Sequence, residues 1–125
     1  MLILKITSYI SFGQLSIKLD QSDSIAVDSS FIKSKEELNL AYHLTKKSTA
    51  AGNNISKQFR YEFLLWLSGK TDIKSAFLST LPKGNSFLII SFGKKLPAID
   101  GKVEKLDLLN KAKSLDLERI SLSRI

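Results

Sequence analysis

The sequence contains no cysteine and only one histidine, His43, among its 125 residues. The lack of cysteine excludes disulfides, zinc–thiolate sites and cysteine nucleophiles, and a single histidine excludes multi-histidine metal sites. We therefore expect no metal and no other cofactor. No apolar run approaches the roughly 18 residues of a membrane-spanning helix, so we expect no membrane contact. A chain without cysteine also fits a reducing interior, and we expect a cytoplasmic protein.

Sequence patterns typical of enzymes are missing as well. Residues 68–71 read Ser-Gly-Lys-Thr and mimic the end of a phosphate-binding Walker A motif, but Leu64 occupies the position of its first glycine, inside an expected helix. The acidic residues are dispersed and form no catalytic pair, and His43 is expected in the middle of a helix beside two lysines. The sequence predicts no catalytic residue, and so a protein that is not an enzyme.

Positive charge is abundant and unevenly distributed. The formal net charge is +7. Residues 1–42 carry a net charge of −1 and residues 98–125 carry +1, so residues 43–97 account for the excess of +7. A localised basic surface predicts an anionic partner, most often a nucleic acid. The alternative is a solvated face that only keeps the protein soluble.

The pattern of apolar residues predicts an α+β fold in one domain that spans residues 1–125. The alternation of apolar and polar residues, together with one nearly continuous apolar run, predicts strands at 2–6, 14–19, 25–27 and 86–92. The last of these has the composition of a central strand. We expect a mixed or antiparallel sheet packed against several helices.

The helices are indicated by their end signals. Ser34 and Glu37 form a capping box, which begins a helix that should run to about residue 51, and Gly52 suits the left-handed position that ends it. Further helices are expected at 55–67, at 71–81 with Thr71 as the cap, and at 104–115.

Glu62 is the one unusual acid. Helical spacing places it on the same face as Ile55, Phe59 and Trp66. A carboxylate among large apolar groups needs hydrogen-bond donors, or its pKa rises. No base, nucleophile or metal ligand accompanies Glu62, so we interpret it as a structural carboxylate bonded to backbone amides or to a nearby cation.

Five polar residues are candidates for a phosphate-contacting surface. Asn53, which is expected to open the helix at 55–67, is spaced to share the polar face of that helix with Lys57 and Arg60. Lys70 and Lys74 lie one turn apart at the start of the next helix. Helix N-termini favour phosphate through their free amides and the helix dipole. Aromatic neighbours such as Phe59, Tyr61 and Trp66 suit a single-stranded nucleic-acid end, or else belong to the core.

The C-terminal segment is apolar to its last residue. Leu108, Leu109, Ala112 and Leu115 are expected on one helix face, which Ile120, Leu122 and Ile125 continue. Chain termini usually fray unless they are held in place. This segment therefore either folds into its own core or docks on a partner, for which the candidate residues are Leu109, Ala112, Ile120, Leu122 and Ile125.

Residues 54–77 read NISKQFRYEFLLWLSGKTDIKSAF. The opening Asn-Ile-Ser, the helical Glu-Phe-Leu-Leu-Trp-x-Ser-Gly and the following Ile-x-x-Ala resemble the kinase-binding small subunit of the KEOPS complex, the CGI-type (TPRKB-like) family, in an archaeal version. The expected helix before this stretch and the apolar strand after it fit the family in order and spacing. The chain departs from the family at Thr71 and Asp72, where Arg-Gln is usual, so Lys70 and Lys74 are the nearest cations.

The resemblance implies a non-catalytic regulatory subunit. KEOPS makes threonylcarbamoyladenosine beside the anticodon of tRNAs that read ANN codons. Its small subunit binds the Bud-type kinase-like ATPase subunit, through it the Kae-type catalytic subunit, and the tRNA 3′ CCA end. The alternative from another class is a small-ligand-sensing or regulatory protein-interaction domain without RNA contact, and an enzyme acting alone is the least favoured.

Overall fold

The computed structural model describes residues 1–8, 12–93, 97 and 101–124, which form an α+β fold, as predicted. The described chain divides into two compact units, Met1–Phe31 with Leu81–Asp107 and Ile32–Thr80 with Leu108–Ile125. The first unit holds the described strands and one helix, and the second holds the other four described helices. One domain spanning 1–125 stays a prediction.

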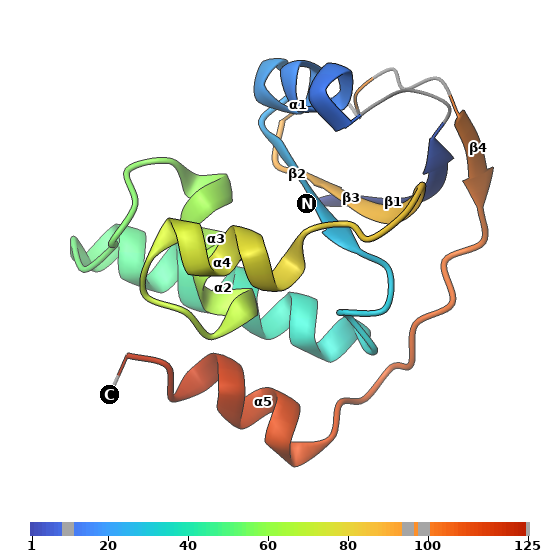
Figure 1. Cartoon of the computed structure of the whole chain (residues 1–125). Coiled ribbons are helices and arrows are strands. Elements are labelled where there is room, and N and C mark those ends of the chain that lie inside the picture. The colour runs from blue at the N-terminus through green and yellow to red at the C-terminus, as the bar shows by residue number, and fades with distance from the viewer. Residues whose placement is uncertain (9–11, 94–96, 98–100, 125) are drawn as a thin grey trace. The chain divides into compact units, whose positions relative to one another are not determined.

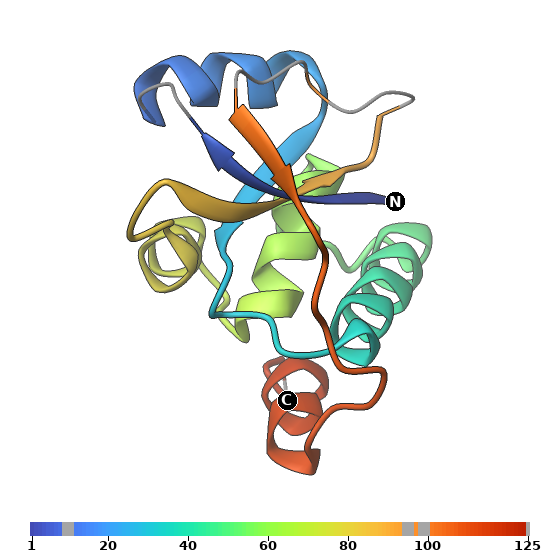
Figure 2. The same cartoon turned by 90° about the vertical axis from the view of Figure 1, so that its right-hand side faces the viewer.

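The first unit is a four-stranded antiparallel sheet with a helix on one face (Figures 1 and 2). Its strand order is β2-β3-β1-β4, with β3 central as predicted and paired to both β1 and β2. The elements are β1 Leu2–Ser8, α1 Phe12–Gln21, β2 Ser24–Asp28, β3 Ser86–Ser91 and β4 Gly101–Glu104.

Helix α1 replaces the strand predicted at 14–19, and this prediction is wrong. Leu15 and Leu19 are both buried and pack with Ile6, Phe87 and Ile89 against the sheet. These two leucines are four residues apart, a spacing that suits one face of a helix as well as one face of a strand. Ile17, which an alternating strand would place beside them, is 61% exposed. The burial of Leu15 and Leu19 together with the exposure of Ile17 therefore follows the period of a helix and not that of a strand.

Strand β4 and the segment after it also correct a prediction. Residues 101–104 pair with β1 as an edge strand, so the helix predicted at 104–115 does not form. Both backbone groups of Leu109 bond to the chain ahead of α2, with its amide 3.0 Å from the Lys33 carbonyl oxygen and its carbonyl oxygen 2.7 Å from the Lys35 amide. The last helix, α5, begins only at Ser114, and Leu108, Leu109 and Ala112 precede it.

The second unit is a cluster of helices, in which α2 and α3 pack together, α4 packs on α3, and α5 packs on both α2 and α3 (Figure 2). Buried apolar side chains of α2, α3 and α5, such as Leu38, Phe63 and Ile120, fill its interior. The elements are α2 Lys35–Ala51, α3 Phe59–Ser68, α4 Ile73–Thr80 and α5 Ser114–Ser121. Within the described ranges, none of the helices combines the length and apolar character needed to cross a membrane.

The observed helix ends confirm some of the predicted capping residues and helix bounds and correct others. The capping box of Ser34 and Glu37 is present, and Gly52 ends α2 in the left-handed region. Helix α3 starts at residue 59 rather than 55. At α4, the Ser75 amide donates to Asp72 Oδ1 over 2.9 Å, so Asp72 takes the capping role that was predicted for Thr71.

Two glycines in equivalent positions give a matched test of how α5 packs. Gly52 and Gly69 end α2 and α3 with φ of 74° and 71°. A Cβ added at Gly52 would have nothing within 4 Å, whereas one at Gly69 would lie 2.8 Å from both Cγ and the carbonyl oxygen of Arg119 in α5. Gly69 therefore allows α5 to approach the end of α3.

We predict that Gly69→Ala destabilises the protein more than Gly52→Ala does. Gly52→Ala should cost about 1–2 kcal/mol, the strain of a left-handed alanine. Gly69→Ala should cost a further 1–3 kcal/mol or so, because the new methyl group overlaps backbone atoms of α5. Urea unfolding of both variants measures the difference, and equal losses would contradict the packing of α5 on Gly69.

Candidate functional site

The centre of the second unit is the carboxylate of Glu62, which is fully buried. Its Oε1 accepts hydrogen bonds from the amides of Ile55 and Ser56 at 3.0 and 3.2 Å. Its Oε2 accepts from Ser48 Oγ at 2.7 Å and from Arg124 Nη1 at 2.6 Å. The backbone amides and the cation expected for a structural carboxylate are all present, so that interpretation is confirmed.

These hydrogen bonds also explain where α3 begins. The amides of Ile55 and Ser56 turn toward Glu62 and donate to its side chain. The chain at 53–58 is therefore irregular, with bends at 55, 57 and 58, and the helix starts at Phe59. The hydrogen bonds to the Glu62 side chain, seven residues after Ile55, therefore keep residues 55–58 out of the helix that the apolar pattern of the sequence predicted.

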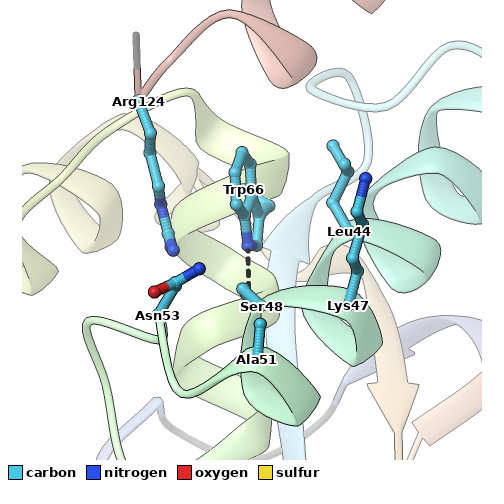
Figure 3. Close-up of a pocket in the computed structure, with 7 residues that line it drawn as sticks. All are labelled: Leu44, Lys47, Ser48, Ala51, Asn53, Trp66 and Arg124. Carbon is cyan, nitrogen blue, oxygen red and sulfur yellow. Dashed lines mark hydrogen bonds between the residues drawn. The ribbon is translucent and has the colours of Figure 1, made fainter.

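Arg124 joins the C-terminal segment to this centre. Its guanidinium lies 3.9 Å from the centroid of the Trp66 ring and bonds to Glu62, and its side chain is only 14% exposed. The indole Nε1 of Trp66 donates to Ser48 Oγ over 3.2 Å (Figure 3). Trp66 is therefore held by a cation–π contact and by a hydrogen bond.

The pKa of Glu62 reflects these opposing contacts. Burial raises the pKa of Glu62, but the hydrogen bonds from Arg124, Ser48 and the Ser56 amide outweigh burial and hold the pKa below its ordinary value. Glu62 is therefore ionised at neutral pH, and the charge of Arg124 balances it. A carboxylate in this state is not a general acid.

A second buried carboxylate repeats the arrangement. Glu37 Oε2 accepts from the amides of Lys33 and Ser34 at 3.1 and 2.8 Å and from the Ser34 hydroxyl at 2.8 Å. Its Oε1 accepts from Arg119 Nη2 at 3.1 Å, and Arg119 also bonds to Asp116 at 3.3 Å. Two arginines of the C-terminal segment therefore anchor it to acids on α2 and α3.

A pocket of about 440 Å³, within the usual size range of small-ligand sites, opens beside Trp66. It is bordered by the C-terminal half of α2, the residue after its glycine cap, α3 and the C-terminal segment (Figure 3). Its lining residues are Leu44, Lys47, Ser48, Ala51, Asn53, Trp66 and Arg124. Of the residues predicted to contact phosphate, Asn53 lies here.

The predicted polar face of Asn53, Lys57 and Arg60 is wrong, because Asn53 and Lys57 precede α3 and are outside any helix. Lys57 is exposed, but Arg60 is only 7% exposed. The guanidinium of Arg60 bonds to Gln58 Oε1 and to the Tyr61 hydroxyl at 3.2 and 3.1 Å and stacks on the Tyr61 ring. Arg60 is therefore not a freely exposed cation.

Lys70 and Lys74 are both exposed, and they flank the start of α4 as predicted. Hydrogen bonds from the amide and hydroxyl of Ser75 lower the pKa of Asp72, and the positive charges of Lys70 and Lys74 lower it further. The two lysines are thus close enough to Asp72 to share one patch of surface.

The residues predicted to bind a partner fall into different environments. Ile120, a candidate partner-binding residue, is fully buried within the second unit and therefore belongs to the core, the alternative that the sequence left open. Leu109 is 67% exposed and Leu122 is 53% exposed, whereas Ala112 is half-buried. Ile125 lies outside the described residues. The C-terminal segment is therefore partly core and partly surface.

Sequence reasoning missed Lys47, Ser48 and Arg124 as site residues. Lys47 and Ala51 are one helical turn apart near the end of α2, so an i, i+4 reading could have placed them on one face. Arg124 carried no such signal, because 62 positions separate it from Glu62.

No protein-family model and no curated protein matches this chain. Among the described residues, no group of three or more acidic or histidine side chains is placed to hold a metal ion. The candidate site therefore rests on its own geometry, a buried glutamate–arginine pair beside a pocket with cationic and aromatic walls.

We predict that Glu62→Ala destabilises the protein by about 1–3 kcal/mol, because buried donors, including Ser48 and Arg124, lose their acceptor. Chemical unfolding at pH 7 measures this loss. Normal stability combined with loss of partner binding would instead identify Glu62 as a functional acid.

The acid limb of the stability curve gives a separate test. Because the pKa of Glu62 is lowered in the folded state, its contribution is present above the ordinary value of 4.5 and is lost as the pH falls through the folded-state pKa. Stability should therefore fall less on acidification in Glu62→Gln than in the native protein. The pKa values of Asp28 and Asp72 are also lowered, so part of the slope remains. Identical acid slopes for both proteins would contradict a lowered pKa.

Proposed function

We propose that this protein is the non-catalytic, tRNA-binding and regulatory subunit of an archaeal KEOPS complex. In this role it binds the tRNA 3′ CCA end and the Bud-type kinase-like ATPase subunit, and it acts in the cytoplasm. The proposal comes from the resemblance over residues 54–77. The observation that carries it is that these residues form one connected part of the second unit, α3, the Gly69 turn and most of α4, with Lys70 exposed at the turn and Lys74 exposed at the start of α4.

The distribution of exposed cations supports a nucleic-acid partner. Most lysines of the basic segment 43–97 that the structure describes belong to the second unit and are exposed there: Lys46, Lys47, Lys57, Lys70 and Lys74. Lysines bind phosphate as point charges and release counterions when they do so, which favours an RNA backbone without fixing its sequence.

The C-terminal segment supports a protein partner. Helix α5 buries Ile120 but leaves Leu115 exposed, and Leu109 ahead of the helix and Leu122 directly after it are exposed as well. Large apolar side chains that gather on one short segment are typical anchors of protein interfaces. We assign the docking surface for the kinase-like subunit to these exposed apolar side chains of the C-terminal segment.

The pocket beside Trp66 favours the second candidate function, the sensing of a small ligand. A concave site with apolar walls and a few cationic groups is not required for contact with an RNA backbone.

The RNA prediction uses a triple variant, Lys57→Glu, Lys70→Glu and Lys74→Glu. It should reduce tRNA affinity strongly and lower the salt slope of log K by about 2, the amount expected for three lost single-strand phosphate contacts. Arg60 is left unchanged because it is buried. Removal of the CCA end from the tRNA should weaken binding by the native protein to a similar extent.

The matched control for the RNA test replaces three exposed lysines of the first unit, Lys83, Lys102 and Lys105, with glutamate. Both triple variants change the net charge equally, so only a local surface distinguishes them. Melting curves check that each variant folds. An equal loss of tRNA affinity in the two variants would mean that overall charge, and not a local surface, determines binding. Unchanged tRNA affinity of the Lys57, Lys70 and Lys74 variant at low salt would refute the proposed phosphate-contacting surface.

The partner prediction uses Leu109→Glu with Leu122→Glu, which alter exposed side chains. This double variant should raise the Kd for the kinase-like subunit at least tenfold and leave tRNA affinity unchanged. Ile17→Glu, an exposed apolar residue of α1, is the control. Truncation after Arg119 is a poorer test, because it removes Ile120 from the core and Arg124 from Glu62. Unchanged affinity of the double variant would place the docking surface elsewhere.

A further inference from the structure

The pocket beside Trp66 combines apolar walls with cationic groups. Leu44, Ala51 and the indole of Trp66 provide apolar surface, and Lys47 and Arg124 provide positive charge. The charge of Arg124 is balanced by Glu62, so Lys47 leaves the pocket with a net positive charge. Such a lining suits a ligand with an apolar body and an anionic group.

Arg124 has hydrogen-bonding capacity that the described residues do not use. Nη1 donates to Glu62, but Nε and Nη2 are buried and have no acceptor among the residues that the structure describes. These two nitrogens lie on one edge of the guanidinium group, the edge that binds carboxylate or phosphate through two parallel hydrogen bonds. Buried donors without an acceptor cost free energy, so an oxyanion at this edge stabilises the site.

The remaining polar groups of the pocket agree with this chemistry. The Asn53 side chain points toward the end of Arg124, and Trp66 stands between Arg124 and Lys47 (Figure 3). An ammonium group and an amide are both donors to oxyanions. The part of the Trp66 indole that lines the pocket provides an apolar wall, although Trp66 is only 8% exposed and Arg124 lies over its ring.

From these contacts we infer that the pocket binds a small molecule in which a carboxylate or phosphate is joined to a planar apolar body, with the oxyanion directed to Arg124 and the positive charge of Lys47 adding to the attraction for the anion. The pocket lining does not include Lys57, Lys70 or Lys74, the three lysines tested for contact with tRNA, and the inference does not depend on that proposal. A volume of 440 Å³ holds one ring-bearing molecule rather than a strand. Because Arg124 belongs to the C-terminal segment, the bound ligand also holds that segment in place.

The fluorescence of Trp66, the only tryptophan in the chain, is the readout. Phenyl phosphate, benzoate and the neutral benzyl alcohol are titrated in a buffer free of phosphate and carboxylate. We expect a saturable change with phenyl phosphate or benzoate, with a Kd of about 1 mM or tighter, and none with benzyl alcohol. Whichever of the two anions binds with the lower Kd shows whether the site prefers a phosphate or a carboxylate. No saturable change with either anion, or an equal change with benzyl alcohol, would overturn the inference.

Variants separate the pocket from general charge effects. Lys47→Gln should weaken binding at least fivefold, and Ala51→Leu should block the pocket without altering its charge. Lys46→Gln, at the neighbouring exposed lysine outside the pocket lining, should bind as the native protein does. Equal weakening by Lys46→Gln and Lys47→Gln would overturn the site.

Arg124→Lys keeps the charge but removes the two-nitrogen edge, so it should weaken binding if the variant folds. Its loss of contact with Glu62 can also lower stability, which is why Lys47→Gln and Ala51→Leu carry the test. Displacement of the bound probe by tRNA would assign the pocket to the RNA surface and overturn an independent small-ligand site. Retention of probe binding in the Lys57, Lys70 and Lys74 triple variant would support it.

Discussion

The second unit depends on two buried carboxylates, Glu37 and Glu62, whose charges are balanced by arginines of the C-terminal segment. A buried ion pair is tolerated only when further hydrogen bonds satisfy its remaining oxygens, and both acids meet this condition with backbone amides and hydroxyls. Glu37 completes the cap of α2, and Glu62 fixes the turn that precedes α3. Removal of Arg119 or Arg124 would leave an uncompensated buried charge, so the C-terminal segment is an integral part of this unit.

The parts of the fold that were predictable are those specified by neighbouring residues. The capping box at Ser34 and the left-handed Gly52 require information from within four positions, and both are present. The segment with Leu15, Ile17 and Leu19 fits two periods at once, and only packing against the sheet selects the helical one. Local patterns therefore identify helix ends more securely than they separate a short helix from a strand.

The candidate site was less predictable, because its contacts join distant parts of the chain. The need of Glu62 for donors followed from its apolar neighbours, but nothing in the sequence indicated Arg124, 62 positions away. The same bonds delay the start of α3 to Phe59, so Lys57 is no longer in the helix and Asn53 no longer adjoins its first turn, and neither is aligned with Arg60 as expected. An error of four residues at a helix start therefore invalidated a predicted surface.

The C-terminal segment connects the structural and proposed functional roles. Ile120 and Arg124 face the interior of the second unit, whereas Leu122 is largely exposed. A partner bound to the exposed apolar side chains of this segment and a ligand bound at Arg124 would both favour the ordered position of the segment. By linkage, each would then strengthen the binding of the other, because the free energy of ordering the segment is shared between them. Coupling between the pocket and the docking surface thus requires no change in the folded structure.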